Sequence, residues 1–243
     1  SAQGAPGTDI HLIPVTIADT TITVGTPVNI TNRRGYDNQP SFTPDGRSVL
    51  YTSTREDGQS DIYRYDIERR TTTRVTSSAE SEYSATVMPG GRRFSVIRVE
   101  ADSTQRLWSF ALDGSDPRLV LPDVKPVGYH AWSDDTTVAV FVLGSPATLQ
   151  VASTRGGAPR TVAGNIGRSL VPVPGTRSIS FMRRDGEGWM IERHDPARGE
   201  TVPVGRAVPK GDYVVWTARG DLLSAGGNRL YLRRRGGGWG GRV

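Results

Sequence analysis

The sequence contains no cysteine among its 243 residues, which excludes disulfide bonds, thiolate nucleophiles and metal sites ligated by cysteine. It has only three histidines, His11, His130 and His194, and no two of them lie at the spacing typical of zinc or manganese ligands. No stretch approaches the roughly 18 consecutive apolar residues that a transmembrane helix needs. We therefore expect no thiol chemistry, no metal site and no transmembrane segment.

Sequence motifs of common enzymes are missing as well. There is no Gly-x-Ser-x-Gly nucleophile elbow, no Gly-x-Gly-x-x-Gly between a strand and a helix, and no P-loop. Acidic pairs occur at Glu56-Asp57, at Glu80 with Glu82 and at Asp134-Asp135, each in a predicted turn. Turn formation explains these acids better than general acid–base catalysis. The sequence predicts no catalytic residues and no enzymatic activity.

Basic residues are in moderate excess and are spread along the chain. The sequence has 30 Lys and Arg against 25 Asp and Glu, a net charge of +5. The densest basic run lies at the C-terminus, in "YLRRRGGGWGGRV". A solvated outer strand followed by a glycine-rich end accounts for this run better than a nucleic-acid contact. We expect no nucleic-acid partner.

The N-terminal sequence "SAQGAPGTD" lacks a methionine and is rich in small residues. A secreted chain begins in this way after its signal peptide is removed, although a shortened sequence would look the same. The absence of cysteine is compatible with the periplasm. We expect a flexible N-terminus over residues 1–8 and a periplasmic or extracellular location.

Glycine and proline are abundant, with 29 and 16 residues, and they punctuate a repeat. The first copy is "SFTPDGRSVLYTS" at 41–53, a short strand, a tight Pro-Asp-Gly turn and an alternating strand. The residue two before the turn recurs at steps of 45, 45, 40 and 44 residues. A period of about 40–45 residues built from strands is typical of β-propellers. The aligned positions are Phe42, Val87, Trp132, Pro172 and Trp216.

Each of these hairpins is followed by a second, more polar hairpin, such as "SDIYRYDIERRTTTRVTS" after the first copy. An alternating hairpin buries only one face, whereas four-stranded blades stacked on their neighbours bury both faces. The pattern predicts an all-β fold, a β-propeller of four-stranded antiparallel blades, in one domain over residues 9–243. The predicted parts are an outer half-blade at 9–32 and repeats at 36–80, 81–126, 127–166, 167–211 and 212–243.

The first repeat resembles those of TolB-like propellers. Its "TPDGR" turn, "TSTREDG" loop, "DIY" strand and terminal "RVT", all within 39–76, carry the resemblance, and the other repeats match mainly in rhythm. The resemblance implies six blades and a protein partner received at the mouth of the channel. For some relatives it also implies Ca²⁺ in the axial channel, to which Asp37 could contribute an oxygen ligand. Other TolB-like propellers are lyases with histidine-rich metal sites, which this sequence does not show.

The number of inner hairpins in the repeats differs from the number of outer hairpins. Five inner hairpins stand against six outer ones, because "DIHLIPVTIADTTITVGTPVNITN" at 9–32 resembles an outer hairpin. Three explanations follow. The predicted propeller is six-bladed with one incomplete blade, whose inner hairpin would lie beyond Val243. The alternative is a five-bladed propeller. In the third explanation a strand of another chain fills the gap, which would make self-association part of the protein's role.

The loops that enter the innermost strands are the predicted binding site, because loops held on a rigid scaffold usually carry function. Four of the five contain tyrosine, which supplies contact area at low entropic cost. Tyrosines that wedge between blades are the competing explanation. The predicted partner-binding residues are Tyr36, Asp37, Tyr83, Tyr129, His130, Arg168, Asp212 and Tyr213.

These observations together predict a non-catalytic propeller that binds a protein or peptide partner through loops at the channel mouth, with no cofactor required. One alternative is a structural subunit of an oligomer or filament assembled by strand sharing. Another is the propeller domain of a polysaccharide lyase or a peptidase.

Overall fold

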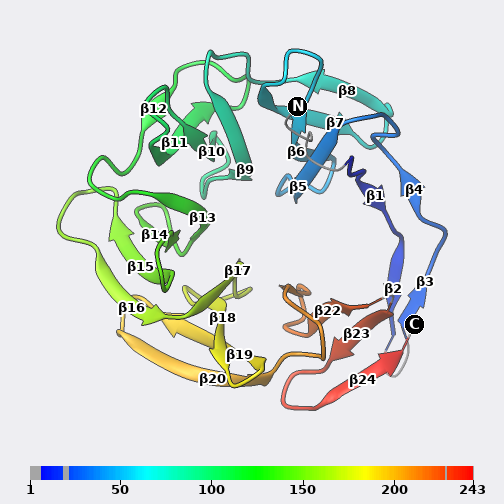
Figure 1. Cartoon of the computed structure of the whole chain (residues 1–243). Helices are drawn as coiled ribbons and strands as arrows, with labels where there is room; N and C mark the ends of the chain where they lie inside the picture. Colours follow the sequence, from blue (N-terminus) through cyan, green and yellow to red (C-terminus); the bar gives the residue numbers. More distant parts are fainter. Residues whose placement is uncertain (1–6, 19–21, 228, 243) are drawn as a thin grey trace. The chain divides into compact units, whose positions relative to one another are not determined.

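A computed structural model describes residues 7–18, 22–227 and 229–242. The regular elements of these residues are all β-strands, and they form five four-stranded antiparallel sheets and two two-stranded ladders (Figure 1). This confirms the predicted all-β propeller of four-stranded antiparallel blades, with five complete blades, the number given as the alternative. Among the described residues, no helix has the length and hydrophobicity needed to span a membrane.

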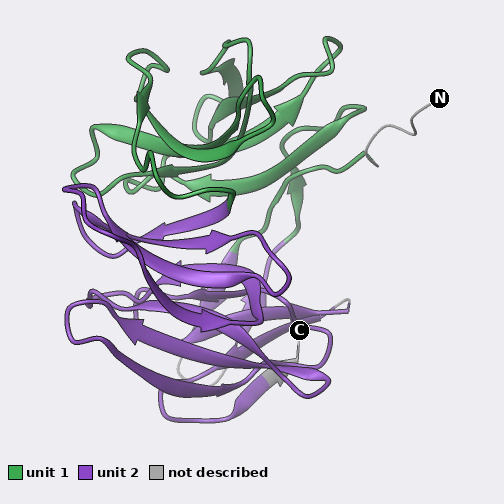
Figure 2. Cartoon of the chain, turned by 60° about the vertical axis from the view of Figure 1, so that its left-hand side comes forward, with its two compact units in different colours: residues 1–14, 26–127 green, residues 15–25, 128–243 purple. Residues whose placement is uncertain are grey.

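The chain divides into two compact units (Figure 2). Unit 1 comprises residues 1–14 and 26–127, and unit 2 comprises residues 15–25 and 128–243. Unit 1 contains two blades, in which the strands pair in chain order. Its strands are β5 (Tyr36–Phe42), β6 (Ser48–Thr54), β7 (Ser60–Asp66) and β8 (Thr71–Arg74), then β9 (Ser81–Val87), β10 (Arg93–Val99), β11 (Gln105–Ala111) and β12 (Arg118–Leu119).

Unit 2 contains three blades of the same topology, the first of which begins at the last residue of unit 1. The third blade of the chain has β13 (Val127–Trp132), β14 (Thr137–Val142), β15 (Thr148–Ser153) and β16 (Arg160–Gly164). The fourth has β17 (Ile166–Pro172), β18 (Ile179–Asp185), β19 (Gly188–Asp195) and β20 (Glu200–Arg206). The fifth has β21 (Val214–Trp216), β22 (Leu222–Gly226), β23 (Arg229–Arg233) and β24 (Trp239–Arg242).

The N-terminal segment forms the two short ladders. In unit 1, β1 (His11–Leu12) pairs with β4 (Val28–Asn29), and in unit 2, β2 (Val15–Ile17) pairs with β3 (Ile22–Val24). Ile10 and Ile30, which flank the first ladder, pack into a cluster with buried tyrosines of the first blade. Burial of these isoleucines holds the ladder on that blade.

Thr8, which belongs to the N-terminal segment 1–8 that was predicted to be flexible, is held by hydrogen bonds. The Thr8 amide donates to the Gly35 carbonyl (3.0 Å), and the Asp37 amide donates to the Thr8 carbonyl (3.1 Å). Two backbone hydrogen bonds to the start of β5 explain why Thr8 is ordered. Residues 1–6, which the same prediction covered, lie outside the described residues.

Burial follows the position of a strand within its blade. The second strands, β6, β10 and β14, are buried along nearly their whole length, because a strand in the middle of a stacked sheet is covered on both faces. Phe94 on β10 stacks on Phe110 (5.5 Å between ring centroids) at the centre of the unit 1 core. The outer strand β8 is exposed throughout, as its Thr- and Arg-rich sequence predicts.

The first strands carry bulges that link neighbouring blades. The pairing of β5 with β6 shifts register between Asn38 and Ser41, where Gln39 has a φ of 55°. The side-chain oxygen of Gln39 accepts a hydrogen bond from the amide of Ser84 on β9 (3.0 Å), a residue with a φ of 56°. The bulges bend the first strands at the point where they meet the neighbouring blade.

Candidate functional site

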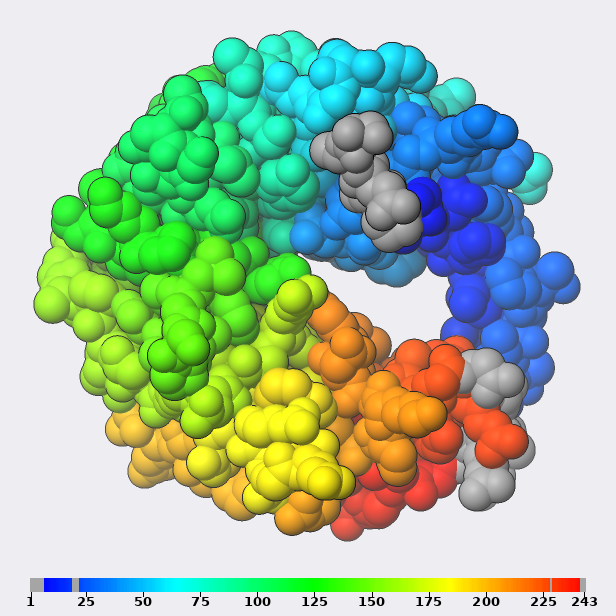
Figure 3. Space-filling view, in the orientation of Figure 1, coloured from blue at the N-terminus to red at the C-terminus, as the bar shows by residue number. Residues whose placement is uncertain are grey.

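The loops that enter the first strands lie at the same end of a blade as the turns between second and third strands, because successive strands run in opposite directions. In the fourth blade, the turn between β18 and β19 and the loop 207–213 leading to β21 together line an open cavity of about 570 Å³. Segments of the fourth and fifth blades, yellow and orange, lie side by side on the surface shown in Figure 3. We call this the blade 4 cavity.

The two segments around the blade 4 cavity are held by local sequence. The turn closes with Asp185 paired to Gly188, and Gly186 between them adopts a φ of 59°, which glycine tolerates without strain. In the loop, the amide of Gly211 donates to the carbonyl of Val208 (2.9 Å). A Cβ at Gly211 would lie 2.5 Å from a methyl group of Val208, so only glycine fits there.

The lining of the blade 4 cavity combines an aromatic ring with charges of both signs. Arg184 lies over the ring of Trp189, 5.2 Å from its centroid, and donates from Nε to the carbonyl of Gly186 (3.0 Å). Arg206 forms an ion pair with Asp185 (2.6 Å). An indole beneath one guanidinium group, with a second arginine in the same lining, favours contact with peptide segments that bring both apolar and polar groups.

Two of the predicted site residues lie in or beside the loop that lines this cavity in unit 2, and a third lies on a neighbouring first strand. Asp212 lines it, and Tyr213, the next residue, is 45% exposed. Arg168 is exposed on β17, a strand that contacts β21, and the neighbouring Ser169 hydroxyl accepts from the Val214 amide (3.2 Å). The sequence analysis did not select Trp189, Arg184 or Arg206. The strand order could have placed the turn between β18 and β19, and the end of β20, at this end of the blade.

The other two predicted residues of unit 2 belong to the interior. Tyr129 is half-buried and packs edge-on against Phe141, with 5.7 Å between ring centroids. His130 is buried, and burial lowers the pKa of its imidazole to about 4. A neutral, buried imidazole and a tyrosine packed against a core ring fit packing between strands better than contact with a partner.

In unit 1 the predicted residues lie on the neighbouring first strands β5 and β9, which contact each other. Tyr36 and Tyr83 are half-buried. Asp37 is buried, and its carboxylate accepts hydrogen bonds from the Ser53 hydroxyl (2.5 Å) and from Arg33 (3.1 Å). The guanidinium of Arg33 already balances this carboxylate, so the residues around Asp37 do not fit a Ca²⁺ site.

No group of three His, Cys, Asp or Glu side chains within the described part of the chain is arranged to hold a metal ion. His194 is buried, and its two ring nitrogens are bonded to Arg160 and Thr201. Neither His130 nor His194 therefore offers a free nitrogen at a surface where a metal could bind together with other ligands.

Comparison with known proteins gives a distant likeness in sequence. No protein-family model matches the chain. An uncharacterized protein of Agrobacterium fabrum is 28% identical over 78 residues, which are 32% of this chain and 26% of that protein. The match thus spans about a quarter of the length of this curated relative.

The likeness in structure is far more extensive. A TolB candidate of Agrobacterium tumefaciens has a TM-score of 0.72 at 15% identity, over 88% of this chain and 83% of that one. TolB of Acinetobacter baumannii has a TM-score of 0.63 at 16% identity, over 82% of this chain and 52% of that one. An oligogalacturonate lyase in complex with manganese has a TM-score of 0.65 at 14% identity, over 97% of this chain and 85% of that one. TolB proteins and a lyase therefore share this architecture, and the chain has the β-propeller fold of TolB proteins.

Proposed function

We propose that this chain is a non-catalytic, TolB-like propeller that binds a protein or peptide partner in the periplasm or outside the cell. The observation that carries the proposal is the blade 4 cavity, an open site of about 570 Å³ lined by Trp189 with Arg184 over its ring, by Arg206 and by Asp212. Tyrosine, tryptophan and arginine are the residues most enriched at the hot spots of protein interfaces. The likeness to TolB structures supports both the binding role and the location.

The lyase alternative has less support. The oligogalacturonate lyase was determined in complex with manganese, whereas the residues that the structure describes form no cluster of three metal-ligating side chains. His130 and His194 are buried, so neither imidazole lies at a surface as a general base. Binding is therefore the function that the geometry supports best.

A double substitution, Asp212→Ala with Tyr213→Ala, tests the binding proposal. Peptides selected from a displayed library on the intact protein are expected to lose at least about tenfold in affinity for the variant, because an aromatic hot spot contributes about 2 kcal/mol or more. Both side chains are exposed, so the free energy of unfolding should change by less than about 0.5 kcal/mol. Isothermal titration calorimetry and urea unfolding measure the two quantities.

A matched control for this experiment is Val202→Ala on the outer strand β20, a residue that is also exposed and lies outside the cavity lining. Its affinity for the selected peptides should equal that of the intact protein. Equal peptide affinity in the double variant and the intact protein would contradict the proposal. A marked loss of stability in the double variant would assign Asp212 and Tyr213 to the scaffold.

Self-association by strand sharing is a second candidate, favoured by the ladder of β1 and β4. These strands pair only with each other within the described residues, and Val28 on β4 is 54% exposed. An unpaired strand edge is a template for pairing with another chain. Native mass spectrometry should show oligomers that Val28→Lys depletes and Val202→Lys on β20 does not; a strictly monomeric protein would exclude this role.

A further inference from the structure

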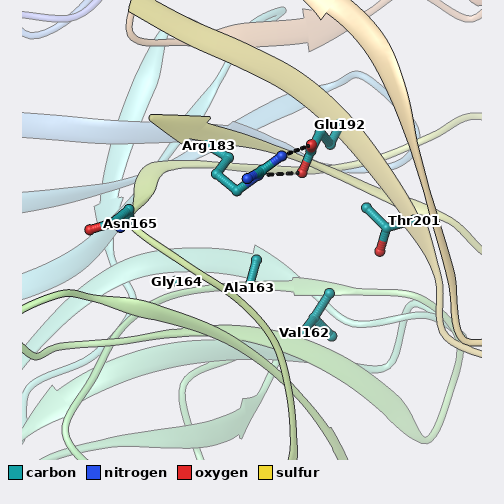
Figure 4. A pocket seen from close by; sticks show the side chains of 7 residues that line it. All are labelled: Val162, Ala163, Gly164, Asn165, Arg183, Glu192 and Thr201. Carbon is teal, nitrogen blue, oxygen red and sulfur yellow. Dashed lines mark hydrogen bonds and ion pairs between the residues drawn. The ribbon is translucent and has the colours of Figure 1, made fainter. Parts of the chain in front are cut away.

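A second cavity of unit 2, of about 520 Å³, lies between the outer strand of the third blade and the fourth blade (Figure 4). Its volume is within the range of about 300–1,000 Å³ that is usual for small-molecule sites. Strand β16 forms one wall, and β18, β19 and β20 contribute the side chains opposite. The lining residues are Val162, Ala163, Gly164, Asn165, Arg183, Glu192 and Thr201.

Arg183 and Glu192 form a two-pronged ion pair in this cavity. Arg183 donates from Nε to one carboxylate oxygen (3.0 Å) and from Nη2 to the other (2.6 Å), and Figure 4 shows both bonds. Glu192 is buried, and the pair neutralises its own charge. The pair therefore favours neither an anionic nor a cationic ligand by its charge. Nη1 of Arg183 and the second lone pairs of the carboxylate oxygens remain to form hydrogen bonds with a ligand.

Thr201 presents a hydroxyl whose hydrogen is directed by the residues behind it. His194 Nε2 lies 3.1 Å from Nη2 of Arg160, and His194 Nδ1 lies 2.8 Å from the Thr201 hydroxyl oxygen. Arginine only donates, so Nε2 must accept and Nδ1 must carry the proton. Nδ1 then donates to the Thr201 oxygen, which leaves the hydroxyl hydrogen for another acceptor.

The imidazole of His194 is neutral near pH 7, so its two nitrogens keep the donor and acceptor roles given above. His194 is buried, and burial first, then the charge of Arg160, lowers the pKa of its ring, while the charge of Asp195 and a hydrogen bond to the backbone of Glu200 act in the opposite direction. A neutral ring has one donor and one acceptor nitrogen, and Arg160 has already determined which is which. The side chain of Thr201 points into the cavity in Figure 4.

The cavity thus combines hydrogen-bond donors, hydrogen-bond acceptors and a small apolar wall, and the charges of its lining residues balance each other. Donors come from Thr201 and Arg183, and acceptors come from Glu192. Val162 and Ala163 supply the apolar wall. We propose that this cavity binds a neutral, hydroxyl-rich ligand, one or two units of an uncharged saccharide, at a site separate from the blade 4 cavity.

Titration of ¹⁵N-labelled protein with neutral disaccharides tests this proposal. Cellobiose, maltose and α-1,4-galactobiose, each raised to high millimolar concentration, serve as the probes. At least one of them should shift the amide signals of residues 162–164 and 201. Digalacturonate, which differs from galactobiose in its carboxylates, should bind more weakly than the best neutral probe. Absence of binding by all three neutral probes, or stronger binding of digalacturonate, would overturn the proposal.

Conservative variants then locate the binding. Thr201→Val removes the hydroxyl and should weaken binding at least about fivefold, the effect of one lost hydrogen bond, whereas Thr201→Ser should stay within about twofold. Because Thr201→Val also removes the Thr201 oxygen as an acceptor for the buried Nδ1–H of His194, Arg183→Lys provides a second test. It keeps a positive charge beside Glu192, loses the guanidinium fork and should bind equally weakly. Unchanged affinity in both Thr201→Val and Arg183→Lys would refute the assignment.

Discussion

Replacement of Arg98 by alanine is expected to lower the free energy of unfolding by about 3–5 kcal/mol, the usual cost of leaving a buried charge without its partner. Arg98 and Glu82 are both buried in unit 1, with Glu82 0% exposed. Two guanidinium nitrogens, Nε and Nη2, lie 3.2 and 3.1 Å from the same carboxylate oxygen. The variant would leave this carboxylate in the interior.

Aromatic rings add to the expected loss. The guanidinium of Arg98 lies over the ring of Trp108, 4.5 Å from its centroid, and 5.0 Å from the centroid of Phe110. Cation–π contacts of a desolvated arginine contribute on the order of 1–2 kcal/mol. Alanine removes these contacts together with the packing of the long side chain.

The loss caused by Arg98→Ala should depend on pH. Burial raises the pKa of Glu82, against the opposing effect of bonds from Ser78, Thr76 and Arg98. A carboxyl whose pKa is higher in the folded state than in the unfolded chain destabilises the fold increasingly as pH rises between the two values. The difference between the variant and the intact protein should therefore shrink as the pH falls toward the ordinary pKa of a glutamate, about 4.3.

Urea unfolding followed by tryptophan fluorescence measures this free energy. The control is the double variant Arg98→Met with Glu82→Gln, which removes both charges and should recover most of the stability. If Arg98→Ala alone left the unfolding midpoint unchanged, the pair would not be buried as the structure shows. A double variant as unstable as Arg98→Ala would assign the loss to packing instead of charge.

Replacement of Phe181 by alanine is expected to cost about 3–5 kcal/mol in unit 2, because the truncation leaves a cavity that the surrounding strands cannot close. Phe181 is 0% exposed on β18, the second strand of the fourth blade. Its cluster includes Phe141 and Leu149 from the third blade and Ile166 and Ile179 from the fourth. The ring thus joins two blades.

Two controls separate burial from ring chemistry in the Phe181 experiment. Phe181→Leu keeps most of the volume and should cost about 1.5 kcal/mol or less. Phe42→Ala removes the same ring from a residue that is 59% exposed, and it should change stability by about 0.5 kcal/mol at most. Equal losses for Phe181→Ala and Phe42→Ala in urea unfolding would contradict the assignment of Phe181 to the core.

The candidate site could be predicted in part. Asp212 and Tyr213 follow from the rule that loops entering first strands are exposed at one end of a blade, and the structure places Asp212 in the lining of a cavity. The same rule selected His130, which is buried on β13. Alternation along a strand tells which residues share a face, but only stacking of the blades decides whether that face meets solvent or a neighbouring sheet.

Bulges are a second reason why the site was only partly predictable. The pairing of β17 with β18 is irregular between Ile166 and Leu170, and the pairing of β5 with β6 shifts between Asn38 and Ser41. Each shift resets which residues face the core in the strands that carry the predicted site. No glycine marks the bulge at Gln39, so the sequence carried no signal for it.

The sequence by itself determined the class of fold. A turn every 40–45 residues with alternating strands between turns is a local pattern, set by backbone sterics and by the periodicity of side chains along a strand, and it led to four-stranded blades without any knowledge of contacts. Only the tertiary structure decided which polar side chains meet. Arg160, Arg183, Glu192 and Thr201 come from different strands of two blades, and their hydrogen bonds follow from stacking geometry that no spacing along the chain encodes.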